Sequence, residues 1–186
     1  MAHGAGAGMR HPFMQRVAEE LAGHRIATIR YNFPFTENNK KRPDSPAVAM
    51  ATVKAAINFA SVQYPGIPLF AGGKSFGGRM TSQFIAQHGA ANVKGIVFFG
   101  FPLHPAGKPG VERANHLQQL AVPMLFLQGT RDPLADVNLI TKVCSDLKTA
   151  TLITFEQADH SFKVSKHDLL PVLARHTVKW MKMVES

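Results

Sequence analysis

The stretch LFAGGKSFGGRM, residues 69–80, contains two overlapping signatures. Gly-Lys-Ser at 73–75 is the end of a phosphate-binding P-loop, whereas Gly-x-Ser-x-Gly at 73–77 is the turn that presents a nucleophilic serine. A P-loop needs a glycine five positions before the Gly of Gly-Lys-Ser, so that consecutive N–H groups wrap the phosphates. That position is Pro68, which has no N–H. The spacing therefore favours the serine turn, with Ser75 as the candidate nucleophile.

The residues around this turn predict a strand on one side and a helix on the other. The apolar run at 67–71 precedes it, and Met80, Phe84 and Ile85 share one face of a segment that ends at Gly89. Strand, sharp turn and helix form the setting of a nucleophile elbow, in which the serine is strained and its neighbours need to lack Cβ atoms. An ordinary glycine-rich turn with an incidental serine is the alternative.

Composition indicates a single globular domain over residues 1–186. The hydrophobic content is 45%, and no apolar run approaches membrane-spanning length. The opening MAHGAGAGMRHP lacks the apolar centre of a secretory signal, so we expect a cytoplasmic protein with no membrane partner. Cys144 is the only cysteine and is expected to be a small buried apolar residue.

The net charge of +9 raises the question of a nucleic-acid partner. The basic residues are scattered, and the one dense cluster is Lys40-Lys41-Arg42 in the segment TENNKKRPDS. The chain has neither zinc-ligand spacing nor an aromatic-rich binding pattern. We therefore expect a solvated basic loop, no nucleic-acid partner and no metal.

Apolar strands alternate with amphipathic helices along the chain, which predicts an α/β fold with a mostly parallel sheet flanked by helices. Helices are expected at 11–24, 46–64, 76–89, 135–147 and 169–184. Strands are expected at 25–33, 67–71, 93–101, 123–129 and 150–156, with a Pro- and Gly-rich loop at 102–116.

Two further strand ends carry residues suited to activate a serine. Asp132 follows the strand at 123–129, and His160 follows the strand at 150–156. In open α/β sheets, active groups gather beyond the carboxyl ends of the strands. Imidazole takes the serine proton, and a carboxylate on the other ring nitrogen holds the tautomer and stabilises the cation. Asp132 could instead cap a helix starting at Pro133, and Asp136 or Glu156 could replace it as the acid.

An acyl-transfer site also needs N–H donors for the oxyanion. The backbone of Phe76, directly after Ser75, is one candidate. The segment HGAGAGM at 3–9 resembles the His-Gly turn of lipases and esterases, which makes Ala5 or Gly6 the second donor. A flexible glycine-rich start is the other interpretation.

Six motifs in order carry a resemblance to a known family: HGAGAGM, YNFPF, GGKSFGGRM, GFPLHPAGKP, LFLQGTRDP and ADHSF. They resemble a small α/β-hydrolase family related to the dienelactone hydrolases, which includes testis-expressed and NSL-complex-subunit proteins. The resemblance spans nearly the whole chain and implies the α/β-hydrolase fold, with Ser75, Asp132 and His160 at the triad positions. It implies little about the substrate, and some relatives serve in regulatory assemblies.

The sequence departs from this family at its beginning. In the fold that the resemblance implies, a strand before the His-Gly turn lies inside the sheet, between the strands expected at 25–33 and 67–71. Only Met1 and Ala2 precede His3, and the strands upstream of that are absent too. The gap would leave two unpaired edges about 9–10 Å apart. We expect either that the sequence begins inside a longer product or that something else fills the gap. If the chain starts at Met1 and nothing fills the gap, we expect the oxyanion loop to be poorly held.

These observations predict a cofactor-free serine hydrolase that cleaves an ester or related acyl bond of a small molecule through an acyl-enzyme. The segment at 102–122 is too short for a lid domain, so an open site is expected. Lys74 and Arg79 flank the serine turn. We expect them to form structural ion pairs rather than to attract an anionic substrate. The alternative function is a catalytically silent interaction module of the same fold, and an NTPase ranks third. The oligomeric state is left open.

Overall fold

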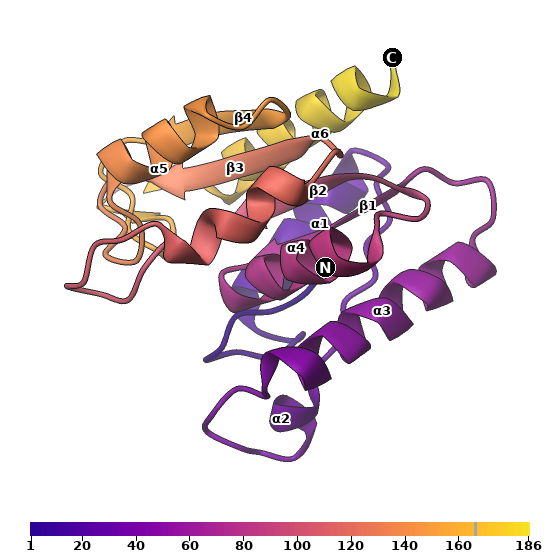
Figure 1. The fold of residues 1–186 in the computed structure, drawn as a ribbon. Coiled ribbons are helices and arrows are strands. Elements are labelled where there is room, and N and C mark those ends of the chain that lie inside the picture. The colour runs from indigo at the N-terminus through magenta and orange to yellow at the C-terminus, as the bar shows by residue number, and fades with distance from the viewer. Residues whose placement is uncertain (166) are drawn as a thin grey trace.

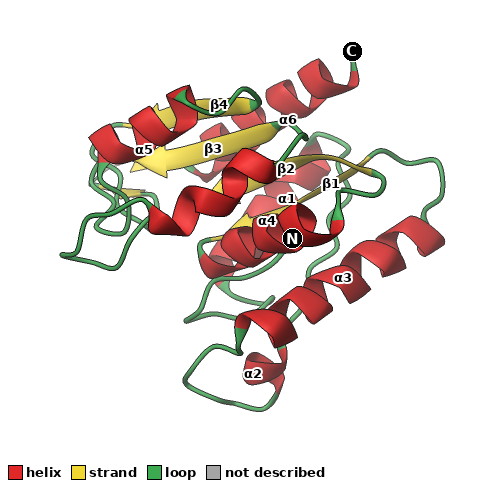
Figure 2. Ribbon diagram, in the orientation of Figure 1, coloured by secondary structure: helices red, strands yellow, loops and turns green. Residues whose placement is uncertain are grey.

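The central sheet is parallel and has the strand order β1-β2-β3-β4 (Figures 1 and 2). The computed structural model describes residues 1–165 and 167–186. The four strands are β1 (Leu69–Lys74), β2 (Val93–Phe99), β3 (Met124–Gly129) and β4 (Ala150–Phe155). A small antiparallel pair, β5 (Lys163–Val164) and β6 (His167–Asp168), lies before the last helix.

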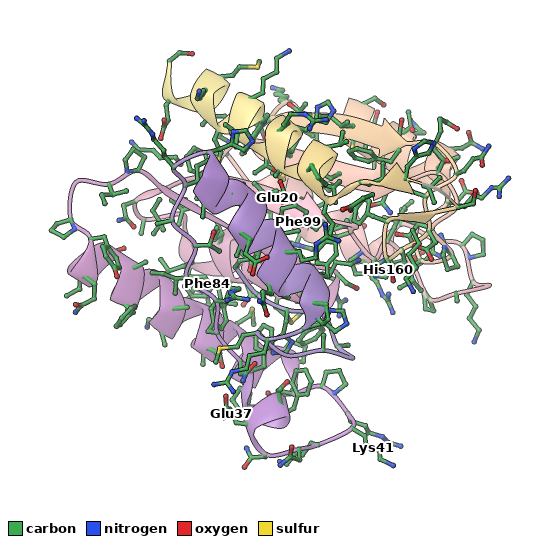
Figure 3. All side chains as sticks on the ribbon, turned by 180° about the vertical axis from the view of Figure 1, so that it is seen from behind. Glu20, Glu37, Lys41, Phe84, Phe99 and His160 are labelled. Carbon is green, nitrogen blue, oxygen red and sulfur yellow. The ribbon has the colours of Figure 1, made fainter. Side chains whose placement is uncertain are left out.

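Helices cover both faces of this sheet (Figure 1). One face is covered by α1 (Pro12–Gly23) and α6 (Leu170–Glu185), which lie in front of the sheet in the view from behind (Figure 3). The other face is covered by α3 (Pro46–Gln63), α4 (Phe76–His88), the 3-10 helix η1 (Glu112–Gln119) and α5 (Val137–Ser145). The short helix α2 (Pro34–Glu37) precedes α3.

The core consists of two apolar clusters separated by the sheet. Along β2, Ile96 and Phe98 point into the cluster under α4, whereas Val97 and Phe99 point into the cluster under α6. Successive side chains of a strand alternate between faces, so a strand covered on both sides must be apolar throughout. This is why β2 and β3 read as continuous apolar runs, and it holds the carboxyl ends of the strands in fixed positions.

The predicted α/β-hydrolase fold with a parallel sheet is confirmed, but the strand expected at 25–33 is wrong. Residues 26–30 have no regular secondary structure, and only Tyr31 forms an isolated parallel bridge, with Ala2. Ala2 forms a second bridge, with Gly73 of β1. The segment at 26–30 has strand-like composition but no neighbouring strand, and β-structure requires a hydrogen-bonded partner. Among the described residues, Ala2 alone pairs with both Tyr31 and β1.

Two other boundaries differ from expectation. The segment at 102–116 was expected to be a loop, but η1 begins within it at Glu112. The helix expected from 135 begins at Val137, because Asp136 caps it by accepting hydrogen bonds from the N–H groups of Asn138 and Leu139 at 2.9 and 3.0 Å. No helix among the described residues is long and apolar enough to cross a membrane.

The basic cluster Lys40-Lys41-Arg42 is exposed on the loop between α2 and α3. Figure 3 shows Lys41 at the tip of this loop, away from His160. The cluster therefore lies apart from the candidate site described below.

Candidate active site

Ser75 occupies the sharp turn between β1 and α4, and its backbone is strained. Its φ is 51° and its ψ is −117°, in a region that residues with a Cβ seldom adopt. The strained turn is fixed to the sheet, because the Ser75 N–H donates to the carbonyl oxygen of Phe99 at 3.2 Å. The side chain is partly exposed at the carboxyl end of β1. This is the geometry expected of a nucleophile elbow.

The glycines on either side of Ser75 make room for the start of the chain. A Cβ on Gly73 would lie 2.2 Å from the carbonyl oxygen of Ala2, and one on Gly77 would lie 2.6 Å from the same residue's carbonyl carbon and oxygen. Both contacts are with backbone, which cannot move aside as a flexible side chain could. The Gly-x-Ser-x-Gly pattern thus reflects close packing against residues 2 and 3 as well as the turn itself.

His160 and Asp132 form a hydrogen-bonded pair. The Nδ1 of His160 lies 2.6 Å from Oδ2 of Asp132, whose side chain is fully buried. Nδ1 therefore carries the proton of the neutral ring, which leaves Nε2 free to accept a proton. The sequence places His160 after β4 and Asp132 after β3, and folding brings them together across 28 residues.

Two other donors hold the Asp132 carboxylate in place. The side-chain amide of Gln128 donates to Oδ2 at 2.6 Å, and the N–H of Leu134 donates to Oδ1 at 2.8 Å. Gln128 also accepts from the N–H of Phe101 at 2.9 Å, so its amide orientation is determined. Sequence reasoning missed Gln128, although a buried polar residue inside the apolar run MLFLQG of β3 was an available signal.

The other two carboxylates considered as the acid are placed elsewhere. Asp136 caps α5, and its N–H donates to Nε2 of the buried His104 at 2.8 Å. Glu156 is exposed. The expectation that Asp132 could cap a helix at Pro133 is not met, since α5 begins at Val137.

Ser75 and His160 approach the same short segment of backbone, at the end of β2. A Cβ on Gly100 would lie 3.4 Å from Cε1 and Nδ1 of His160, and Phe99, the preceding residue, accepts the hydrogen bond from the Ser75 N–H. Figure 3 shows Phe99 and His160 on the face that α1 and α6 cover. Among the described residues, no hydrogen bond joins the Ser75 hydroxyl to the His160 ring.

Lys74 links the strand that carries Ser75 to the loop that carries His160. Its Nζ donates to the carbonyl oxygen of His160 at 2.5 Å and lies 5.7 and 5.5 Å from the ring centroids of Phe13 and Phe162. Burial lowers the pKa of Lys74 to about 8, although the nearby carboxylates of Asp132 and Asp159 act to raise it.

The expectation of ion pairs at Lys74 and Arg79 is wrong for the described part of the chain. The pairs found within 4.0 Å there are Arg16–Asp168, Lys142–Asp146 and His160–Asp132. Lys74 bonds a carbonyl instead. Burial lowers the pKa of Arg79, and the positive charge of Arg113 lowers it further.

The expected oxyanion loop begins beside the serine. A Cβ on Gly4 would lie 3.6 Å from the Ser75 Cβ, whereas Ala5 and Gly6 are exposed in the turn that follows. The buried ring of His3 anchors this turn: its Nε2 accepts from the N–H of Phe33 at 3.1 Å, so Nδ1 carries the proton and donates to the carbonyl of Gly4 at 2.8 Å. Burial lowers the pKa of His3, which favours this neutral form.

A second serine–histidine pair occurs within the layer formed by α4 and η1. The Oγ of Ser82 lies 2.7 Å from Nε2 of His116. Ser82 is completely buried within α4, and no ion pair with a carboxylate is found for His116 in the described residues. Burial, and then the charge of Arg79, lowers the pKa of His116 to about 4, so its ring is a weak base at neutral pH. The pair has the form of a structural contact between two helices.

Solved structures of similar fold cover nearly all of this chain. It resembles a dienelactone hydrolase from Anabaena variabilis with a TM-score of 0.77 and 20% identity, covering 98% of this chain and 83% of that one. It resembles Est1E from Butyrivibrio proteoclasticus, solved with ferulic acid, with a TM-score of 0.76 and 14% identity, covering 98% and 86%. For an α/β serine hydrolase homologue from Coxiella burnetii the TM-score is 0.76 at 18% identity, covering 94% and 83%.

These likenesses concern the fold, because all three identities are low. The sequence itself matches a family model described as an alpha/beta hydrolase domain, over residues 1–179. The match extends from the glycine-rich segment at 3–9 through Ser75, Asp132 and His160 to α6. The chain therefore belongs to the α/β-hydrolase domain family.

Proposed function

We propose that this protein is a serine hydrolase that cleaves an ester or related acyl bond of a small molecule. Ser75 is the nucleophile, His160 the general base and Asp132 the carboxylate that orients the imidazole. The observation that carries the proposal is the 2.6 Å hydrogen bond from His160 to the buried Asp132, in a hydrolase-family chain that also holds a serine in a strained elbow.

The chemistry follows from these positions. The Nε2 of His160 takes the Ser75 proton as Oγ attacks the acyl carbon, and then returns it to the leaving group, which gives an acyl-enzyme. Water activated by the same ring hydrolyses that intermediate. The Asp132 carboxylate stabilises the imidazolium formed in both steps, and the three groups that donate to it (His160, Gln128 and Leu134) keep it in place.

The oxyanion donors belong to the same proposal. The N–H of Phe76 occupies the first turn of α4, where an N–H has no intrahelical acceptor. The second donor is the N–H of Ala5 or Gly6, in the turn that His3 anchors beside Ser75. Each such donor contributes about 10²–10³ in rate in enzymes of known mechanism.

The substrate class is a small acyl compound. Est1E, a protein of the same fold, was solved with ferulic acid bound, and another structural neighbour is a dienelactone hydrolase. Both are consistent with small organic acids or lactones, which fits a segment at 102–122 too short for a lid domain. A panel of short-chain aryl esters and lactones measures this preference directly.

A fluorophosphonate probe tests the nucleophile. We expect it to label the wild-type protein, not to label Ser75→Ala, and to label Ser82→Ala as strongly as wild type. Ser82→Ala is the matched control, because Ser82 is the other serine hydrogen-bonded to a histidine. Labelling that persists in Ser75→Ala, or that disappears only in Ser82→Ala, contradicts the assignment. A folded wild type that no probe labels favours the silent interaction module instead.

A further inference from the structure

The His160 loop, residues 156–162, is held on either side of His160 by contacts with the rest of the protein. Residues 157 and 158 form hydrogen bonds of 2.9 Å with residues 130 and 131, and the Phe162 side chain is buried in the cluster under α6. Between these contacts, the backbone of His160 has one hydrogen bond among the described residues, from Nζ of Lys74 to its carbonyl oxygen at 2.5 Å. Lys74 therefore holds the backbone of the loop at the proposed base.

The ammonium group of Lys74 is enclosed beside the end of β2. A Cβ on Gly100 would lie 3.0 Å from Nζ and 3.4 Å from Cε1 and Nδ1 of His160, so the ammonium and the imidazole meet over the same glycine. On the other side, the ring centroids of Phe13 and Phe162 lie 5.7 and 5.5 Å from Nζ, within the range of a cation–π contact. These neighbours keep the ammonium at the His160 carbonyl.

Two fixed points determine where the free nitrogen of the His160 ring is directed. The hydrogen bond of 2.6 Å between Nδ1 and Asp132 holds the ring, but the ring can still pivot about that bond. The bond from Lys74 holds the backbone end of the same residue. Because its donor is charged, this bond is stronger than one between neutral groups. Together the two bonds set the direction of Nε2.

Lys74 also ties the base to the strand of the nucleophile, since it directly precedes Ser75. Its bond is the one hydrogen bond among the described residues that joins β1 to the His160 loop. The backbone on the β1 side is fixed, because Lys74 pairs with Phe99 in the sheet and the Ser75 N–H donates to the Phe99 carbonyl at 3.2 Å. A shift of the loop relative to Ser75 therefore has to break the bond from Lys74.

We propose that Lys74 is a positioning residue for acyl transfer, whose ammonium holds the His160 carbonyl so that Nε2 of the imidazole stays directed at the Ser75 hydroxyl. This inference rests on the proposed function, in which His160 is the general base. Lys74 acts through the histidine and takes part in no bond-making step. The carboxylates of Asp132 and Asp159 lie near enough to attract its charge. Position matters because a misplacement of about 1 Å can lower a rate by about 10²-fold.

Lys74→Met tests the role, because it removes the donor and keeps an unbranched side chain that packs well against aromatic rings. The matched control is Lys94→Met, which removes the same charge from an exposed side chain on β2. We expect Lys74→Met to lower the plateau kcat for a short-chain aryl ester by about 10–100-fold, with KM within about twofold of wild type. Lys94→Met should behave as wild type. Lys74→Gln repeats the test if Lys74→Met does not fold.

The pH profile separates position from charge. If Lys74 acted through its charge alone, its loss would move the acidic limb of the kcat profile to higher pH and leave the plateau unchanged. That result overturns the proposal. An unchanged kcat with a raised KM also overturns it, because Lys74 would then contact the substrate.

A second measurement does not depend on turnover. The proton between His160 and Asp132 is followed by NMR as a low-field signal, assigned by its loss in Asp132→Asn. We expect its exchange with water to be about tenfold faster in Lys74→Met than in wild type or Lys94→Met, because the ring is less well held. Equal exchange in all three overturns the positioning role, whether or not an ester is cleaved. Faster exchange in a protein whose wild type cleaves no ester contradicts the proposed function alone.

Discussion

The carboxylate of Asp132 is the most tightly held ionisable group of the candidate site. It is buried and meets the imidazole of His160, the amide of Gln128 and the N–H of Leu134. The contact between Asp132 and His160 could be predicted from the sequence, because each follows an apolar strand at the sheet's carboxyl edge, whereas their catalytic roles stay a prediction. The sequence could not reveal Gln128 as their support, since that role depends on two hydrogen bonds formed only after folding.

We predict that Asp132→Asn lowers kcat for a short-chain aryl ester by about 10³–10⁴-fold, because an amide neither holds the required tautomer nor stabilises the imidazolium. The amide also faces the Gln128 donor, so we expect a loss of about 1–3 kcal/mol in the free energy of unfolding. Steady-state kinetics and chemical denaturation measure the two effects. Glu156→Gln removes an exposed carboxylate as the control and should change neither; a similar loss in both variants contradicts the role of Asp132.

At the scale of elements, β1 and the loop after β4 are joined by the hydrogen bond from Lys74 to the His160 carbonyl. The elements themselves were largely predictable, because β2 and β3 are buried on both faces and read as apolar runs. The segment at 26–30 was not, because its sequence has strand character but strand formation depends on a neighbour. The contact of Lys74 was also unpredictable, since sequence spacing cannot distinguish a carbonyl partner from a carboxylate.

We predict that the free energy of unfolding of the wild type, relative to Lys74→Met, increases between pH 8 and 10.5. The folded protein lowers the pKa of Lys74 to about 8 from 10.5, so in this range the unfolded chain binds a proton that the folded chain does not. The relative gain is on the order of 1–2 kcal/mol for this partly exposed side chain. Urea denaturation across this range measures it.

The comparison with Lys74→Met is needed because Cys144 acts in the opposite direction. Burial raises the pKa of its thiol to about 12 from 9.0, which destabilises the folded state as the pH rises above 9. That effect is present in both proteins and cancels. A difference that stays flat from pH 8 to 10.5 contradicts the burial of the Lys74 ammonium.

At the scale of the whole molecule, the first two residues hold together parts of the chain that are otherwise separate. Ala2 bridges β1 and Tyr31, and the Met1 nitrogen donates to Ile29. Burial, and then the charge of Arg30, lowers the pKa of the Met1 amino group to about 5 from 8.0. The sequence predicts a gap in the sheet between the segment at 25–33 and β1. It does not predict that Met1 and Ala2 lie between these two segments and form hydrogen bonds with them.

We predict that the 186-residue chain loses stability as the pH falls from 8 to 5, relative to the same chain with an acetylated Met1. In this range the unfolded amino group binds a proton that the folded one excludes, so the cost grows as the pH decreases, to about 2–4 kcal/mol. Acetylation removes the titration and leaves one N–H for the bond to Ile29. Denaturation curves of both forms at several pH values test this, and parallel curves contradict it.

The buried amino end also matters to anyone who produces this protein. A purification tag fused ahead of Met1 removes the free amino group that donates to Ile29 inside the fold, whereas one fused after the exposed Ser186 extends from the end of α6. Recombinant samples that carry the tag at different ends are therefore expected to differ in structure at the turn beside Ser75. Their measured activities should be compared only with the position of the tag taken into account.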